Sequence, residues 1–229
     1  MKVDVISLFP RIFEGVFTES ILQRAIDAGH LQVTIHDLRA YTTDKHHKAD
    51  DYRFGGGPGM VLKAEPWFRV LKDIFDTSPR RPLVVFPTPQ GEPFTQRTAD
   101  ALSRETHLIF LCGHYKGIEE RVVERRVDRP YSLGDFVMTS GELASAAMLD
   151  AAVRLIPGVL GNLDSAMTDS FRDGLLDGPH YTRPEVFDNN SVPGVLLSGC
   201  HANIHLWRQA MARLITKRRR PDLIAKKQV

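Results

Sequence analysis

Short apolar runs alternate with longer segments through the first half of the chain, and this alternation constrains the fold more than any other feature. The runs lie at residues 3–9, 31–38, 83–86 and 107–112 and have the length of strands. The segments between them are long enough for helices. Because strands that alternate with helices pair side by side in parallel, the pattern predicts an α/β fold with a mostly parallel sheet.

Local signals predict the helices of this scaffold. Residues 12–29 carry apolar positions near helical spacing and end on a glycine. Residues 95–105 form a second helical segment, in which Thr95 is the expected N-cap. Residues 142–157, rich in Ala and Leu, end at a proline and predict a third helix.

A stretch dense in Gly, Asp, Ser and Pro, residues 158–184, has the composition of a linker or functional loop. A chain of 229 residues is long enough for one large domain with a smaller addition. We therefore expect a main domain over residues 1–160, an interdomain linker over 161–173 and a small, mainly helical domain over 174–229. The clearest helix of the last part is residues 201–221.

Positive charge is concentrated at the end of the chain. The formal net charge is only +2, yet residues 200–229 hold eight Lys or Arg and a single Asp. The remainder is therefore acidic, and a basic tail of this kind suits a polyanion such as nucleic acid. A solvated helix end, present only for solubility, is an equally ordinary explanation of such a run.

The two cysteines, Cys112 and Cys200, lack the paired spacing of a zinc site or a disulfide framework, which favours a reducing compartment. The N-terminal apolar run is too short and too polar for a secretory signal, and no window approaches a membrane span. We expect a cytoplasmic protein without membrane association.

Glycine-containing loops follow three apparent strands, at residues 87–94, 113–121 and 132–142. Glycine lets a backbone approach a ligand closely, and ligands of open α/β sheets collect at the carboxyl ends of the strands. The loops are either plain turns or the walls of one pocket. Residues 55–59 lack the dinucleotide fingerprint and no Walker A sequence occurs, which disfavours NAD-dependent redox chemistry and nucleotide hydrolysis. A nucleoside held by backbone groups remains compatible.

Seven ordered motifs cover nearly the whole chain. They are YRFGGGPGM (52–60), PQGEPF (89–94), LCGHYKGIEERV (111–122), SLGDFVMTSGELA (132–144), RLIPGVLGN (154–162), DSF (169–171) and GLLDGPHYTRPEVF (174–187). Together they resemble the bacterial tRNA (guanine-N1)-methyltransferases of the SPOUT class. The resemblance implies a deep trefoil knot in the first domain and methyl transfer from S-adenosylmethionine to N1 of guanosine at tRNA position 37, next to the anticodon.

The same resemblance implies that the three loops hold the methyl donor. The implied cofactor-binding residues are Pro89, Gln90, Gly91, Gly113, Tyr115, Leu133, Gly134, Asp135, Phe136, Val137, Met138 and Gly141. The family often has arginine and glutamate where this chain has His114 and Lys116. A glutamate suits a ligand ammonium group, so either Glu119 or Glu142 takes over that role here or the ammonium group faces solvent.

Methyl transfer to N1 requires a base, because N1 of neutral guanine carries a proton. Asp169 matches the family's catalytic aspartate, and Arg154 matches the arginine that stabilises negative charge at O6. Read without the resemblance, Asp169 is an N-cap and Arg154 is an exposed helical arginine. The resemblance also implies magnesium dependence. We expect no metal site built from protein ligands, since no carboxylate cage is evident and His46 and His47 are adjacent.

For tRNA capture, the basic tail supplies residues suited to phosphate contacts. They are Arg208, Arg213, Lys217, Arg218, Arg219 and Arg220. The resemblance further implies a homodimer in which each site combines the first domain of one subunit with the linker and tail of the other. Two other functions are compatible with the sequence: a SPOUT enzyme that methylates a ribose 2′-hydroxyl or an rRNA base, and a non-catalytic RNA-binding protein.

Overall fold

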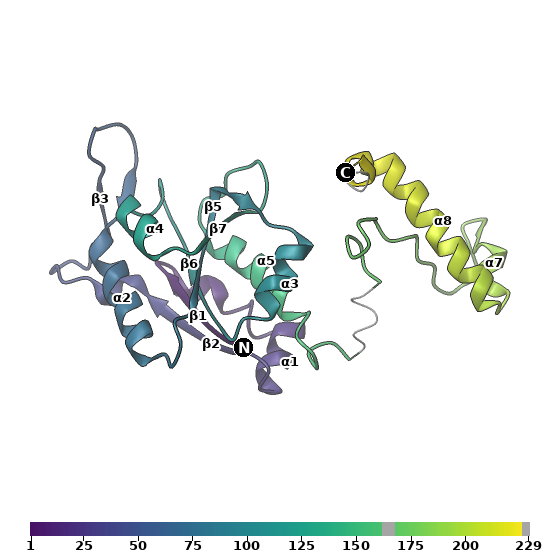
Figure 1. Cartoon of the computed structure of the whole chain (residues 1–229), viewed down its shortest axis with the longest axis horizontal. Coiled ribbons are helices and arrows are strands. Elements are labelled where there is room, and N and C mark those ends of the chain that lie inside the picture. The colour runs from purple at the N-terminus through teal and green to yellow at the C-terminus, as the bar shows by residue number, and fades with distance from the viewer. Residues whose placement is uncertain (162–167, 226–229) are drawn as a thin grey trace. The chain divides into compact units, whose positions relative to one another are not determined.

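The computed structural model describes residues 1–161 and 168–225, which belong to two compact units, Met1–Gly161 and Asn162–Val229 (Figure 1). The first unit contains a five-stranded sheet, and the second consists mainly of helices. Within the described residues, no helix combines the length and the apolar character that a membrane crossing requires.

The sheet of the first unit is parallel throughout, with strand order β2-β1-β6-β5-β7. Its strands are β1 (Lys2–Ser7), β2 (Gln32–Asp37), β5 (Leu83–Pro93), β6 (His107–Leu111) and β7 (Arg129–Ser132). The predicted parallel α/β architecture is therefore confirmed. Strand β7 is the strand expected before the loop at 132–142, although it is not among the apolar runs, because its sequence RPYS is short and it forms an edge of the sheet.

Helices cover both faces of the sheet, which explains why its central strands are apolar on both sides. Alternate residues of β6 point to opposite faces: Leu108 and Phe110 join one buried cluster, and Ile109 and Leu111 join the other. The first cluster is covered by α1 (Ser20–Asp27), α3 (Gln96–Ser103) and α5 (Glu142–Val153), and the second by α2 (Ala64–Thr77) and α4 (Glu120–Arg126) (Figure 1).

The helix predictions have mixed outcomes. Thr95 caps α3, since its hydroxyl accepts a hydrogen bond from the Thr98 amide, and α5 and α8 (His201–Arg219) occupy two of the other predicted segments. Residues 12–29 do not form one helix. A 3₁₀ turn, η1 (Pro10–Phe13), is followed by α1, and Ser20 at the start of α1 has a φ of 54°, which a continuous right-handed helix does not permit.

The remaining elements are short. The first unit also contains η2 (Leu38–Tyr41) and an antiparallel hairpin of β3 (Asp50–Tyr52) and β4 (Met60–Leu62). The second unit contains β8 (Val186–Phe187), β9 (Asn190–Ser191), α7 (Gly194–Leu197), α8 and α9 (Pro221–Ala225). Among its described residues no apolar side chain is buried, so this unit has no hydrophobic core comparable to that of the first.

Candidate active site

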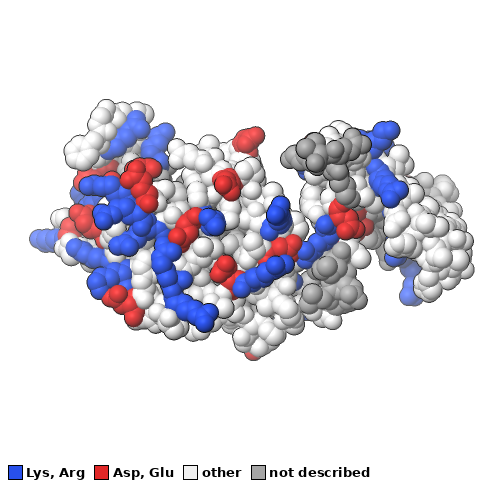
Figure 2. Space-filling view, viewed as in Figure 1, with Lys and Arg blue, Asp and Glu red and all other residues white. Residues whose placement is uncertain are grey.

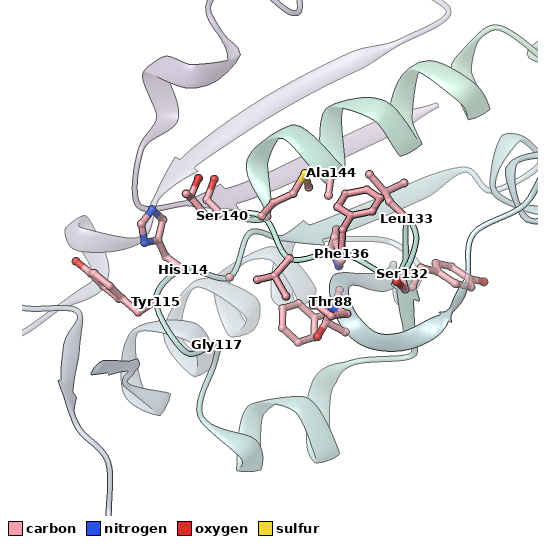
Figure 3. Close-up of a pocket in the computed structure, with 18 of the residues that line it drawn as sticks. Thr88, His114, Tyr115, Gly117, Ser132, Leu133, Phe136, Ser140 and Ala144 are labelled. Atoms are coloured by element: carbon pink, nitrogen blue, oxygen red, sulfur yellow. The ribbon is translucent and has the colours of Figure 1, made fainter. Parts of the chain in front are cut away.

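A pocket of about 240 Å³ lies beyond the carboxyl ends of β5, β6 and β7 (Figure 3). Each strand leads into one of the three glycine-containing loops, and all three loops contribute to the wall. The lining residues are Phe86, Pro87, Thr88, Pro89, Gly113, His114, Tyr115, Lys116, Gly117, Tyr131, Ser132, Leu133, Gly134, Phe136, Val137, Met138, Thr139, Ser140, Gly141 and Ala144. The volume approaches that of small-molecule pockets, roughly 300 to 1,000 Å³.

An irregularity in β5 forms the first wall. Pro87 and Glu92 both pair with Tyr131 of β7, so the four residues between them are looped out of the ladder. A Cβ atom on Gly91 would lie 2.4 Å from the backbone nitrogen of Tyr131. Glycine at residue 91 is therefore required for β5 to pair with β7 again after the bulge. The bulge in turn positions Thr88 and Pro89, which line the pocket.

A backbone contact joins the second and third loops. The amide of Gly141 donates a hydrogen bond of 2.8 Å to the carbonyl of Gly113. A Cβ atom on Gly141 would lie 2.9 Å from the Gly113 nitrogen, so a side chain at this position is incompatible with the contact. The two loops are therefore held at backbone distance, which brings residues far apart in the sequence to one cavity.

Aromatic and apolar side chains form the rim. Tyr115 is about half exposed and adopts a left-handed φ of 59°, a conformation that costs energy for a residue with a Cβ. Its ring lies 4.8 Å from that of His114 (Figure 3). Phe136 and Val137 on the third loop are also exposed. Flat apolar surfaces beside backbone polar groups suit a ligand such as a nucleoside.

Most of the residues expected to hold the methyl donor lie in this wall. Nine of the twelve do: Pro89, Gly113, Tyr115, Leu133, Gly134, Phe136, Val137, Met138 and Gly141. Gln90, Gly91 and Asp135 do not line the cavity, although Gly91 shapes it from behind. The pocket is also lined by Thr88, Ser132, Thr139 and Ser140, which the sequence did not single out, and by His114 and Lys116, which it marked only as departures from the family pattern.

A buried polar network lies behind the pocket. The Ser7 hydroxyl donates a 2.6 Å hydrogen bond to Glu142 Oε1 at the start of α5, and Glu142 is completely buried. The Ser145 hydroxyl donates to the Gly141 carbonyl and lies 3.3 Å from Cys112 Sγ. Burial, together with the Glu142 charge, raises the pKa of the Cys112 thiol well above its usual value. Cys112 therefore stays protonated and serves packing rather than nucleophilic chemistry.

Asp169 lies in a separate cavity of about 600 Å³ within the second unit. Thr168, Arg172 and Asp173 share its wall with Gln209 and Arg213 of α8. No helix begins at Asp169, so the N-cap interpretation is wrong. The chain turns instead, with Phe171 at a φ of 74°.

Arg154 is the C-cap residue of α5 in the first unit and is partly buried rather than fully exposed. Asp169, which is expected to act as the general base, belongs to the second unit. The two residues expected to perform the chemistry are thus carried by different units of the chain.

Basic side chains follow one another at the end of α8. The last turn contains Lys217, Arg218 and Arg219, and the helix ends before Arg220. Arg220 makes a bidentate ion pair with Asp222, with distances of 2.9 and 2.8 Å. In Figure 2, lysine and arginine side chains also appear on the first unit, where acidic side chains are interspersed among them.

Comparison with known proteins identifies the family. The family model described as tRNA (Guanine-1)-methyltransferase TrmD matches residues 1–226. The chain belongs to this family. It is 48% identical over 229 residues to proteins named tRNA (guanine-N(1)-)-methyltransferase from Bacillus cereus (strain AH820), Bacillus anthracis (strain CDC 684 / NRRL 3495) and Bacillus thuringiensis subsp. konkukian (strain 97-27). In each case the match covers 100% of this chain and 94% of the relative.

Membership in the tRNA (guanine-N1)-methyltransferase family makes the chain an S-adenosylmethionine-dependent tRNA methyltransferase and confirms the resemblance found in the sequence motifs.

The sequence resemblance also implied magnesium dependence. Within residues 1–161 and 168–225, no group of three or more His, Cys, Asp or Glu residues has an arrangement that fits a metal ion. The described residues thus contain no cage of three or more such ligands, and no chemical step is assigned to magnesium.

Proposed function

We propose that this enzyme transfers the methyl group of S-adenosylmethionine to N1 of guanosine at tRNA position 37, next to the anticodon, with Asp169 as general base. The observation that supports it most is the convergence of the three glycine loops on one pocket in a chain of this family. The donor supplies an electrophilic methyl group on a sulfonium centre. Of the twelve residues assigned to the donor from the sequence, the nine in the pocket wall are proposed to contact it, and Gln90, Gly91 and Asp135 are proposed to shape the loops that surround it.

The pocket fits the donor in two respects. Gly141 lets the second and third loops meet at backbone distance, since a Cβ there would lie 2.9 Å from the Gly113 nitrogen, and Tyr115, Phe136 and Val137 offer surfaces for an adenine ring. The SPOUT-type trefoil knot in the first unit is part of the proposal because family membership implies it.

The chain's own residues supply the remaining chemistry. Asp169 accepts the N1 proton of guanine as the methyl group arrives, and the Arg154 guanidinium stabilises the negative charge that develops at O6. The target base must leave its stack to be reached, so an unpaired anticodon-loop nucleotide is the expected substrate. Such a substrate implies action in the cytoplasm.

Methyl incorporation tests this function directly. Unmodified tRNA transcripts with guanosine or adenosine at position 37 are incubated with labelled S-adenosylmethionine and then digested to nucleosides. We expect N1-methylguanosine from the guanosine transcript alone. A 2′-O-methylated nucleoside, or label only in rRNA, would favour the other SPOUT activity, and binding of tRNA without any incorporation would favour a non-catalytic protein.

The basic tail is proposed to bind tRNA phosphates through Arg208, Arg213 and the Lys217–Arg220 cluster. Replacing both Arg218 and Arg219 by Gln is expected to weaken tRNA binding and to reduce the slope of log affinity against log salt by about two, one for each lost phosphate contact. Arg220→Gln is the matched control. Its guanidinium is already paired with Asp222, so a smaller change is expected. Filter binding at several salt concentrations measures the slope, and an unchanged slope in the double variant would locate the RNA surface elsewhere.

A homodimer is proposed in which each site combines the first unit of one subunit with the linker and tail of the other. The second unit supports this, because its described apolar side chains, such as Leu206 and Leu214 of α8, are exposed rather than packed into a core. An isolated unit of this size without a core is expected to need a packing partner.

Complementation between inactive variants tests the shared site. Arg154→Ala and Asp169→Asn are each expected to be nearly inactive alone. Co-expressed, they form heterodimers in which one of the two sites contains both wild-type residues, so the purified heterodimer should show about half of the wild-type activity per dimer. The measurement is methyl incorporation by purified, differently tagged heterodimers compared with each homodimer. Persistent inactivity of the heterodimer would mean that both residues act within one subunit.

A further inference from the structure

The proposed donor pocket carries a positive charge, although its ligand S-adenosylmethionine is itself a cation. Among the twenty residues of its wall, all of them within the described part of the chain, Lys116 alone carries a fixed charge. The wall contains no carboxylate, since Asp135 of the third loop does not line it. The only other basic side chain there is His114.

Lys116 is held at the rim through its backbone and its stem. Its amide donates a 3.1 Å hydrogen bond to the Met60 carbonyl in the β3–β4 hairpin. Its methylene groups pass over Gly59, where a Cβ atom would lie 2.8 Å from Lys116 Cγ. Gly59 has a φ of 94°, a conformation that glycine adopts readily. The absence of a side chain at residue 59 thus leaves the space that the lysine stem occupies.

The nearby acids do not neutralise this lysine. Glu119 pairs with Arg121 at 2.8 Å, and Glu142 is buried against Ser7. Neither glutamate lines the pocket, and no ion pair of Lys116 occurs among residues 1–161 and 168–225. Neither can therefore receive a ligand ammonium group from within the cavity.

S-adenosylmethionine carries a positive sulfonium, a positive ammonium and one negative group, its α-carboxylate. An unneutralised lysine repels the first two and attracts the third. We infer that Lys116 binds the α-carboxylate at the amino-acid end of the donor and thereby positions the donor. A glutamate at residue 116 would instead bind the ammonium group. The inference rests on the proposed function, since it requires the donor in this pocket.

Decarboxylated S-adenosylmethionine is the discriminating probe, because it keeps the adenosine, sulfonium and ammonium groups and lacks the carboxylate. Calorimetric titration of the full-length wild-type protein is expected to give about three- to tenfold tighter binding of S-adenosylmethionine than of this probe, the range for one partly exposed charge-assisted hydrogen bond. Lys116→Met keeps the stem over Gly59 and should reduce the ratio to about one. Lys116→Glu should invert it.

Two controls separate local contact from general effects. Lys72→Met removes an exposed lysine of α2 that does not line the pocket, and the ratio should stay at the wild-type value. 5′-Methylthioadenosine lacks the whole amino-acid end and should bind wild type and Lys116→Met equally. An equal ratio in wild type and Lys116→Met would overturn the role of Lys116 while leaving the pocket assignment intact. Failure of wild type to bind any of the three nucleosides would overturn the pocket assignment as well.

Discussion

Asp169→Asn is expected to lower the turnover number by about 10²- to 10⁴-fold, the usual contribution of a general base. Asparagine has the same shape as aspartate but does not accept the N1 proton of guanine. Because the donor pocket is formed entirely by residues of the first unit and Asp169 lies in the second, S-adenosylmethionine should bind the variant as it binds wild type. Single-turnover methyl transfer with saturating tRNA measures the chemical step directly.

Asp173→Asn is the matched control for this experiment. Asp173 lines the same cavity as Asp169 and loses the same charge on substitution, but it has no proposed role in proton transfer. We expect its rate to stay within about tenfold of wild type. Comparable loss in the two variants would indicate that the cavity needs negative charge in general, and near-normal turnover by a folded Asp169→Asn variant would exclude Asp169 as the base.

Gly91→Ala is expected to weaken donor binding by more than tenfold, because the new side chain would displace the backbone of the neighbouring strand. The new Cβ atom would lie 2.4 Å from the nitrogen and 2.6 Å from the Cα of Tyr131. Since both atoms belong to the β7 backbone, no side-chain rotation relieves the overlap, and β5 and β7 must separate. We expect a loss of about 3 kcal/mol in the free energy of unfolding, at the upper end of overpacking effects. Affinity for S-adenosylmethionine should fall by more than tenfold, because β7 leads directly into the third loop.

Gly15→Ala controls for the loss of a glycine as such. A Cβ atom on Gly15 would meet no atom within 4 Å, so stability and donor binding should be nearly unchanged. Urea unfolding and calorimetric titration of both variants make the comparison. Wild-type donor affinity in Gly91→Ala would show that the bulge of β5 does not shape the pocket.

The scaffold was predictable where local patterns decide structure. Apolar runs of strand length identified β1, β2, β5 and β6, and Thr95 was recognised as an N-cap because one hydroxyl in the right place satisfies a helix amide. The apolar runs did not include β7, whose sequence RPYS pairs with β5 at the edge of the sheet, although a strand was expected before the third loop.

In the candidate site, too, local sequence patterns predicted some features and contacts between distant segments decided the others. Glycines in three loops after strands indicated a backbone-lined pocket, and nine of the residues expected there line it. The contacts that place Gly91 and Lys116 were not deducible from those loops. Gly91 acts through contact with β7 some forty residues later, and the Lys116 stem lies against Gly59, which precedes it by more than fifty residues.

The amino-acid sequence by itself determined the parallel α/β class, the position of the pocket-forming loops and, through ordered motifs, the family. These features depend on residue type and spacing within one short segment, where propensity, capping and glycine freedom act. Only the tertiary structure decided which loop residues face the cavity, that Glu142 is buried while Lys116 remains at the rim, and that Asp169 begins no helix. Such outcomes depend on close packing between distant segments, and packing distances of a few ångströms are not encoded in any local pattern.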